Sequence, residues 1–331
     1  MTGPCGALIA AVLALFSAGG VPRAPSAAGA DTALFAFHAD FWLNLHHFLY
    51  ATARARRGLD SGRSVAARAL ADTVGFGALP PEDQDAWRTS VAWYDSALAA
   101  RDILLDPGMV EIDDRVAVLD SSPTPEGTGL GAALVTVLER AAPVYRRLWW
   151  PAHDAANRRW LERERPLLAS DGDSLEAQER RLFRQPWPER PIRVDVTAYA
   201  NWAGAYTSVD PARITVSSGD PADQDDDGFE ILFHEVLHTV DDTLFDALQS
   251  AFWAAGKSMP RDPTHPLIFY TAGELTRRAI PGHVPYAEKY GLWSRTPTFA
   301  RARRALERSW RLYLDGSVTF EEALRRYAAA F

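Results

Sequence analysis

Hydrophobic positions recur at helical spacing through most of the first half of the chain. Loops rich in proline, glycine and serine separate the apolar stretches, which lie at residues 35–53, 66–73, 86–104 and 132–165. Pro151 interrupts the last stretch and favours two helices over one, because proline removes a backbone donor. We therefore predict a helical N-terminal region that extends from residue 31 to residue 186.

The pattern changes to alternation after Pro186. Residues 192–197 alternate between apolar and polar side chains, which predicts a half-buried strand. Two further short strands are expected at residues 203–209 and 213–217, with a turn at Asp210-Pro211 between them.

Helical spacing returns in the last third of the chain. One long helix is expected from Gly228 to about Ala255, and later helices are expected at residues 266–280, 301–314 and 320–330. Helices, a small group of strands and again helices make an α+β layout. We expect a mostly helical fold with a small antiparallel sheet, and a second region that spans residues 187–331.

The N-terminus has the features of an export signal. Residues 6–19 form an apolar run shorter than the ~18 residues that a membrane span needs. Ala28-Gly29-Ala30 follows with small side chains suited to cleavage before Asp31, so residues 1–30 are predicted to be a signal peptide. The run lacks a preceding Lys or Arg, and an uncleaved anchor stays open as the alternative. Cleavage would remove Cys5, the single cysteine, which would exclude disulfides and thiolate catalysis.

Export from the cytoplasm, to the periplasm or the medium, can be tested at the new N-terminus. N-terminal sequencing of protein recovered outside the cytoplasm is expected to begin at or near Asp31. A full-length cytoplasmic product that begins at Met1 would contradict this prediction.

Composition and charge narrow the classes of partner. The chain is 47% hydrophobic and 24% charged, which is typical of a globular protein rather than a disordered one. The net charge of −8 argues against nucleic acid, because binding to phosphates needs a basic surface. No stable membrane span is expected once the signal peptide has been removed.

The strongest chemical signal is His234-Glu235-Val236-Leu237-His238. Histidines four residues apart on a helix lie on one face, so both imidazoles can bind one cation. Glu235 lies about 100° further round the helix, where it can touch a water without binding the metal. Two neutral imidazoles and a carboxylate base are the groups that zinc-assisted hydrolysis requires. We therefore predict one Zn²⁺ per chain.

A zinc site needs a third protein ligand and an open position. In the metzincin pattern, Gly and a His or Asp ligand would stand at the positions of Asp241 and Leu244, so that pattern is excluded. Glu274 is the predicted third ligand, with Gly273 allowing close packing beside it. The alternative is a surface carboxylate paired with a neighbouring arginine.

The motif and the distant glutamate resemble the zincin metallopeptidases and are similar to their gluzincin branch. The resemblance covers about residues 190–290 and implies His234, His238 and Glu274 as ligands and Glu235 as general base. It also implies hydrolysis of a peptide or protein substrate, which would lie antiparallel to the edge strand of a sheet beside the metal-binding helix. The spacing to Glu274 is longer than in the thermolysin-like branch. A non-catalytic, zinc-stabilised binding protein of the cell envelope is the alternative function.

Several further side chains are candidates for supporting roles. Tyr270 and Tyr286 are favoured as stabilisers of the oxyanion that forms during hydrolysis. His265, His283 and Tyr290 are the other candidates for that role. Asp241 or Asp242 is suited to accept the outer N–H of a ligand imidazole.

The apolar stretch near the N-terminus contains His38, His46 and His47. Buried polar groups need partners, so one interpretation is that these are satisfied core histidines. The other is that this stretch covers the cleft, with His46 or His47 within about 10 Å of the zinc, where it could meet a bound substrate.

Overall fold

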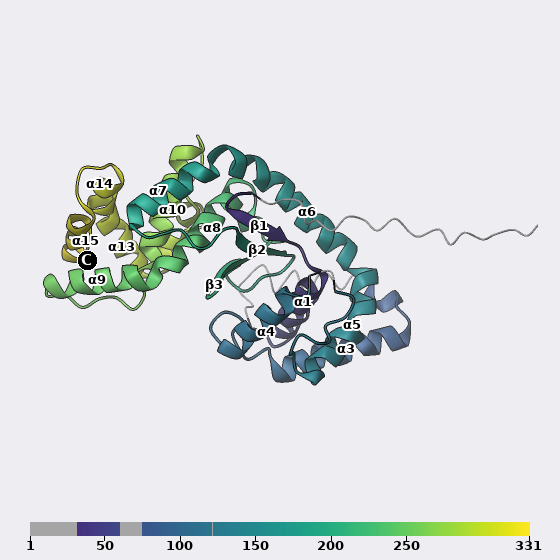
Figure 1. Ribbon diagram of the computed structural model, residues 1–331. Helices are drawn as coiled ribbons and strands as arrows, with labels where there is room; N and C mark the ends of the chain where they lie inside the picture. The colour runs from purple at the N-terminus through teal and green to yellow at the C-terminus, as the bar shows by residue number, and fades with distance from the viewer. Residues whose placement is uncertain (1–31, 60–74, 121) are drawn as a thin grey trace, which may run out of the picture.

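A small mixed sheet lies at the centre of the molecule, between two groups of helices (Figure 1). The computed structural model describes residues 32–59, 75–120 and 122–331. The strands are β1 (Phe35–His38), β2 (Ile192–Thr197), β3 (Ala205–Val209) and β4 (Ala212–Ser217), in the order β1-β2-β4-β3. The α+β fold class is confirmed. The predicted signal peptide at residues 1–30 and the predicted helical stretch at residues 66–73 lie outside the described residues.

The sheet differs from the expected antiparallel one in two of its three pairings. β1 pairs with β2, and β2 with β4, in parallel, whereas only β3 and β4 are antiparallel. β1 was expected to be part of a helix. Its four residues alternate between buried and half-buried, and the helix begins only after Asp40. Four alternating residues beside a long apolar helix are too few to separate the two periods in the sequence.

The N-terminal helices pack on one side of the sheet. They are α1 (Phe41–Arg56), η1 (Phe76–Ala78), α3 (Pro81–Ala97), α4 (Pro107–Ala117) and α5 (Ala132–Leu148). Their buried residues form one apolar core, to which Tyr206 of β3 also belongs. The predicted break near Pro151 is confirmed, since α5 ends at Leu148 and α6 (Trp150–Leu167) follows. In Figure 1, α6 runs from this group towards the opposite end of the molecule.

A second apolar core joins the other side of the sheet to the remaining helices. These elements are η2 (Leu168–Gly172), α7 (Asp173–Phe183), η3 (Pro221–Asp223), α8 (Asp226–Leu237), η4 (His238–Val240), α9 (Asp241–Ala254), α10 (His265–Ala279), α11 (Tyr286–Lys289), α12 (Leu292–Arg295), α13 (Pro297–Arg308), α14 (Trp310–Leu314) and α15 (Phe320–Ala330). The predicted helices at 266–280 and 320–330 are confirmed by α10 and α15. Among the described helices, none has both the length and the apolar character needed to cross a membrane.

The single long helix expected from Gly228 to Ala255 is interrupted at its centre. α8 ends at Leu237, a short 3₁₀ turn covers His238–Val240, and α9 begins at Asp241. Asp241 and Asp242 occupy the first turn of α9, where the helix dipole favours negative charge. The interruption places His238 at the end of one helix, with an aspartate of the next helix beside it.

Candidate metal centre

Three imidazoles meet at the end of α8. The ligand atoms of His234, His238 and His265 all lie within 4.8 Å of one another. Their ring centroids are separated by 5.0, 5.2 and 5.2 Å, which is close to an equilateral triangle. A tetrahedral zinc ion with nitrogen ligands at about 2.0–2.1 Å places three ring centroids about 5 Å apart. The spacing of the rings therefore fits one zinc ion.

The structure brings His265, rather than Glu274, to the two histidines of the motif. Both residues belong to α10, and Glu274 follows His265 by nine residues. A helix rises 1.5 Å per residue, so the two residues are about 13 Å apart along the axis and cannot share an ion. Glu274 Oε2 instead lies 2.5 Å from Arg277 Nη2, which is the alternative that the sequence left open.

Gly273 does permit close packing, but for a different reason than expected. A methyl group at this position would come within 2.7 Å of Pro285 Cβ and 3.1 Å of Glu230 Oε1. Glu230 is buried and accepts a hydrogen bond from the Tyr286 backbone N–H at 2.9 Å. The glycine thus lets α10 approach both the segment before α11 and the buried Glu230 of α8.

Two of the three imidazoles are oriented by aspartates. His238 Nδ1 lies 2.7 Å from Asp241 Oδ2, and His265 Nδ1 lies 3.4 Å from Asp262 Oδ2. An outer carboxylate fixes the tautomer of a ligand imidazole and leaves Nε2 to the metal. Of the two aspartates that the sequence suggested, Asp241 makes this contact. The Nδ1 atom of His234 is buried with no hydrogen-bond partner among the described residues, so no outer group orients this third imidazole.

The electrostatic surroundings differ between the two histidines of the motif. Burial lowers the pKa of His234 well below its ordinary value, and the neighbouring His238 and His265 lower it further. Burial also acts to lower the pKa of His238, but the hydrogen bond to Asp241 and the charge of Glu235 outweigh it and raise that pKa. His234 is therefore a neutral imidazole at pH 7, the form that binds zinc.

Phe269 holds two of the rings in place. It lies one turn after His265 on α10, and its ring stacks on His234 at 3.9 Å and on His265 at 4.7 Å between centroids. Side chains four residues apart on a helix lie on the same face, so α10 presents the imidazole and its packing partner together.

Glu235 lies beside the imidazoles and is almost fully buried, with 5% of its surface exposed. Burial raises the pKa of this carboxyl group, while His238 and a hydrogen bond from Thr207 act in the opposite direction. The general base predicted from the motif thus lies in a largely water-excluded place next to the three histidines.

A cavity of about 800 Å³ opens in front of these residues. Its walls come from strand β3 and the segment before it, from α8, η4 and the start of α9, from α10 to α13, and from the loop before α4. The residues that line it are Leu104, Leu105, Trp202, Ala203, Ala205, Tyr206, Thr207, Val209, Ile231, His234, Glu235, His238, Thr239, Asp241, Asp242, His265, Phe269, Tyr286, Leu292, Arg295, Thr296 and Phe299. Many of these residues are apolar, and Leu105 and Val209 are strongly exposed. The volume is ordinary for a ligand site.

The two favoured tyrosines lie in different places. Tyr286 lines the cavity, and its ring stacks on Phe269 at 6.0 Å. Tyr270 is not among the cavity residues, and its ring packs near Trp293 at 6.4 Å. Only Tyr286 is therefore in a position to reach a substrate beside the histidines.

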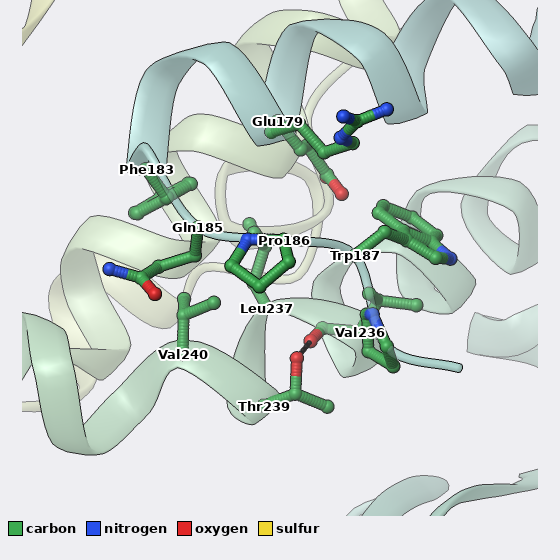
Figure 2. Close-up of a pocket in the computed structure, with 11 residues that line it drawn as sticks. Glu179, Phe183, Gln185, Pro186, Trp187, Val236, Leu237, Thr239 and Val240 are labelled. Atoms are coloured by element: carbon green, nitrogen blue, oxygen red, sulfur yellow. Dashed lines mark hydrogen bonds between the residues drawn. The ribbon is translucent and has the colours of Figure 1, made fainter.

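A second, much smaller pocket lies behind α8 (Figure 2). Val236 and Leu237 of α8 line it, together with the buried carboxyl of Glu179 and the ring of Trp187. Its volume of about 10 Å³ is no more than one water molecule occupies, so it cannot hold a substrate.

The histidines of α1 are core residues. His46 and His47 are fully buried and do not line the cavity. His46 Nδ1 lies 2.8 Å from the Tyr94 hydroxyl, and His47 Nδ1 lies 3.0 Å from the Ala200 carbonyl oxygen. Burial lowers the pKa of His47 to about 4, so that imidazole is neutral at pH 7. This packing supports the interpretation as core histidines. His46 Nε2 makes no hydrogen bond among the described residues but lies 3.2 Å from the buried Asp113 Oδ1.

His38 belongs to a separate group with Asp40 and Asp120, whose ligand atoms also lie within 4.8 Å of one another. Asp40 Oδ2 is 2.9 Å from Arg193 Nη2. Burial and the neighbouring Asp120 raise the pKa of Asp40 to about 8 and outweigh Arg193, which acts to lower it. Asp40 is therefore protonated at pH 7, and a protonated carboxyl is a poor metal ligand, so this group is a weaker candidate than the three histidines.

No family model, curated protein or solved structure matches this chain. The resemblance to zincins therefore rests on the residues of the site alone. The sequence predicted His234 and His238 on one face of a helix with Glu235 beside them, but it indicated His265 only as a candidate oxyanion stabiliser. The structure places all four residues on the wall of one cavity. The sequence did not identify Thr207, Leu104 or Leu105 as residues of the cavity, because no motif marks them.

Proposed function

We propose that this protein is a zinc-dependent hydrolase that cleaves peptide bonds. The observation that carries the proposal is the position of Glu235, a buried carboxylate beside three converging imidazoles on the wall of a substrate-sized cavity. A site that only stabilised the fold would need the ligands but no adjacent base and no open cavity. We propose further that residues 1–30 direct the protein out of the cytoplasm.

His234, His238 and His265 would hold the zinc ion, which when bound polarises a carbonyl and lowers the pKa of water. Glu235 accepts a proton from a water molecule while the oxygen of that water attacks the carbonyl carbon of the peptide bond. Glu235 then passes that proton to the nitrogen as the carbon–nitrogen bond breaks, so the base is regenerated. Tyr286 is the cavity side chain suited to donate to the oxyanion.

Strand β3 supports a peptide as the substrate. It is an edge strand that pairs only with β4, and Ala203, Ala205, Thr207 and Val209 line the cavity. The Ser217 backbone N–H donates to the Gly204 backbone oxygen at 2.9 Å, so the backbone groups of residue 204 point towards β4. Those of residue 206, two positions further along β3, point the same way. Hydrogen bonding alternates along an antiparallel pair. The backbone groups of Ala205 and Thr207 therefore face the free edge, where an extended peptide could add as a further strand.

Peptide hydrolysis is testable with purified, zinc-loaded protein and a broad library of peptides. We expect cleavage that a chelator abolishes and that added zinc restores, because the activated water depends on the metal. The apolar cavity lining leads us to expect preferred cleavage beside large apolar side chains. Product analysis by mass spectrometry reads out both results.

Binding of one zinc ion per chain without cleavage of any peptide would contradict this function. That outcome would favour the alternative, a zinc-stabilised binding protein of the cell envelope. Cleavage that persists after complete removal of zinc would show that another site performs the hydrolysis.

A further inference from the structure

The carboxylate of Glu235 receives a hydrogen bond from the edge strand. Thr207 Oγ1 lies 2.7 Å from Glu235 Oε2 and 2.8 Å from the backbone oxygen of the same residue. A hydroxyl has one proton to donate, and an ionised carboxylate is the stronger acceptor. The contact therefore ties one oxygen of the proposed base to strand β3.

Burial makes this contact strong and hard to replace. Thr207 is 8% exposed and Glu235 is 5% exposed. Hydrogen bonds are stronger in a buried, low-dielectric place, and bulk water has little access to take over a lost partner. Without the hydroxyl, the Glu235 side chain would be free to adopt other rotamers.

We propose that Thr207 is a positioning residue for Glu235. Its hydroxyl occupies Oε2 and thereby leaves Oε1 as the oxygen that takes the proton from the attacking water. The backbone of Thr207 faces the edge along which the substrate would lie, so one residue would set the direction of both the base and the peptide. This inference rests on the proposed hydrolase function.

Thr207→Val removes the hydroxyl while keeping the size of the side chain and its preference for a strand. We expect kcat to fall about 10- to 100-fold with KM within about twofold, because the lost interaction orients a group that acts in the transition state. Thr207→Ser keeps the hydroxyl and should stay within about threefold of the parent. Zinc content should be unchanged in both variants.

Thr276→Val is the matched control. Thr276 is fully buried in α10, its hydroxyl has no hydrogen-bond partner among the described residues, and it does not line the cavity. It should keep the activity of the parent. If Thr207→Val fails to fold, Thr207→Ala is used instead of it in each measurement. The alanine removes the same hydroxyl without placing a new methyl group against Glu235.

A double-mutant cycle asks whether Thr207 acts through Glu235. On a Glu235→Gln background, Thr207→Val should reduce the remaining activity by less than about threefold. A full loss on that background, or an unchanged kcat for Thr207→Val in the presence of Glu235, would overturn the positioning role while leaving the hydrolase function intact.

A binding measurement keeps the test independent of turnover. Acetohydroxamate is a small zinc chelator whose N–H and O–H groups can donate to a carboxylate beside the metal. Calorimetry with zinc-loaded protein should show about 10-fold weaker binding for Thr207→Val than for the parent, and parent-like binding for Thr207→Ser and Thr276→Val. Equal binding by Thr207→Val and the parent would overturn the inference, even if the parent cleaves no peptide and the proposed function fails.

Discussion

Replacing Glu235 with glutamine is expected to reduce peptide hydrolysis by at least about 100-fold, the lower end of the effect of losing a general base. Glutamine keeps the size of the side chain and an oxygen that can accept from Thr207, but it cannot take a proton at neutral pH. Glu235 is no ligand, so zinc content and the thermal unfolding temperature should stay near those of the parent. Steady-state kinetics on a cleaved peptide, metal analysis and calorimetry measure the three quantities.

Glu179→Gln is a matched control for this substitution. Glu179 is also buried, and burial raises the pKa of its carboxyl group well above the ordinary value, as burial also raises that of Glu235. It lines the small pocket behind α8 (Figure 2) and is not among the residues of the cavity. Exchange for a neutral amide should leave hydrolysis within about twofold. Full activity of Glu235→Gln would contradict water activation by Glu235, and loss of zinc together with activity would point to a structural role.

The parts of the fold that the sequence predicted are those set by local periodicity. The strand at residues 192–197 alternates strictly, and the helices at 132–165 and 320–330 show sustained apolar spacing. His234 and His238 could be placed on one face of a helix, with Glu235 about 100° further round, because helical geometry alone fixes that relation. β1 and the break at His238 were not predicted from the sequence, because contacts with residues distant in the chain decide them.

The position of His265 beside the motif could not be predicted from local sequence patterns. His265 and Glu274 lie on the same helix, and both are compatible with a helix that returns towards the motif. Which end of α10 reaches the motif at the end of α8 depends on the path of residues 255–264 and on the stacking of Phe269 against His234. That contact joins residues far apart in sequence, and no motif marks it. The gluzincin resemblance favoured the glutamate, whereas packing brings the histidine.

The zinc affinity of single variants distinguishes His265 from Glu274 as the third ligand. His265→Ala removes one of three converging imidazoles and should weaken zinc binding by more than about 100-fold, which exceeds the 10- to 100-fold loss typical of an outer hydrogen-bonding partner. Asp241→Ala, which removes such a partner from His238, should fall within that smaller range. Glu274→Ala breaks only a partly exposed pair with Arg277 and should bind zinc like the parent.

Competition with a chromophoric chelator at fixed pH gives the four affinities on one scale. Circular dichroism on the metal-free proteins checks that each variant is folded before zinc is added, so that a lost ligand is distinguished from a lost fold. The order expected is parent and Glu274→Ala tightest, Asp241→Ala weaker and His265→Ala weakest. If Glu274→Ala loses zinc while His265→Ala keeps it, the glutamate is the ligand, and α10 must approach the motif by its other end when the metal binds.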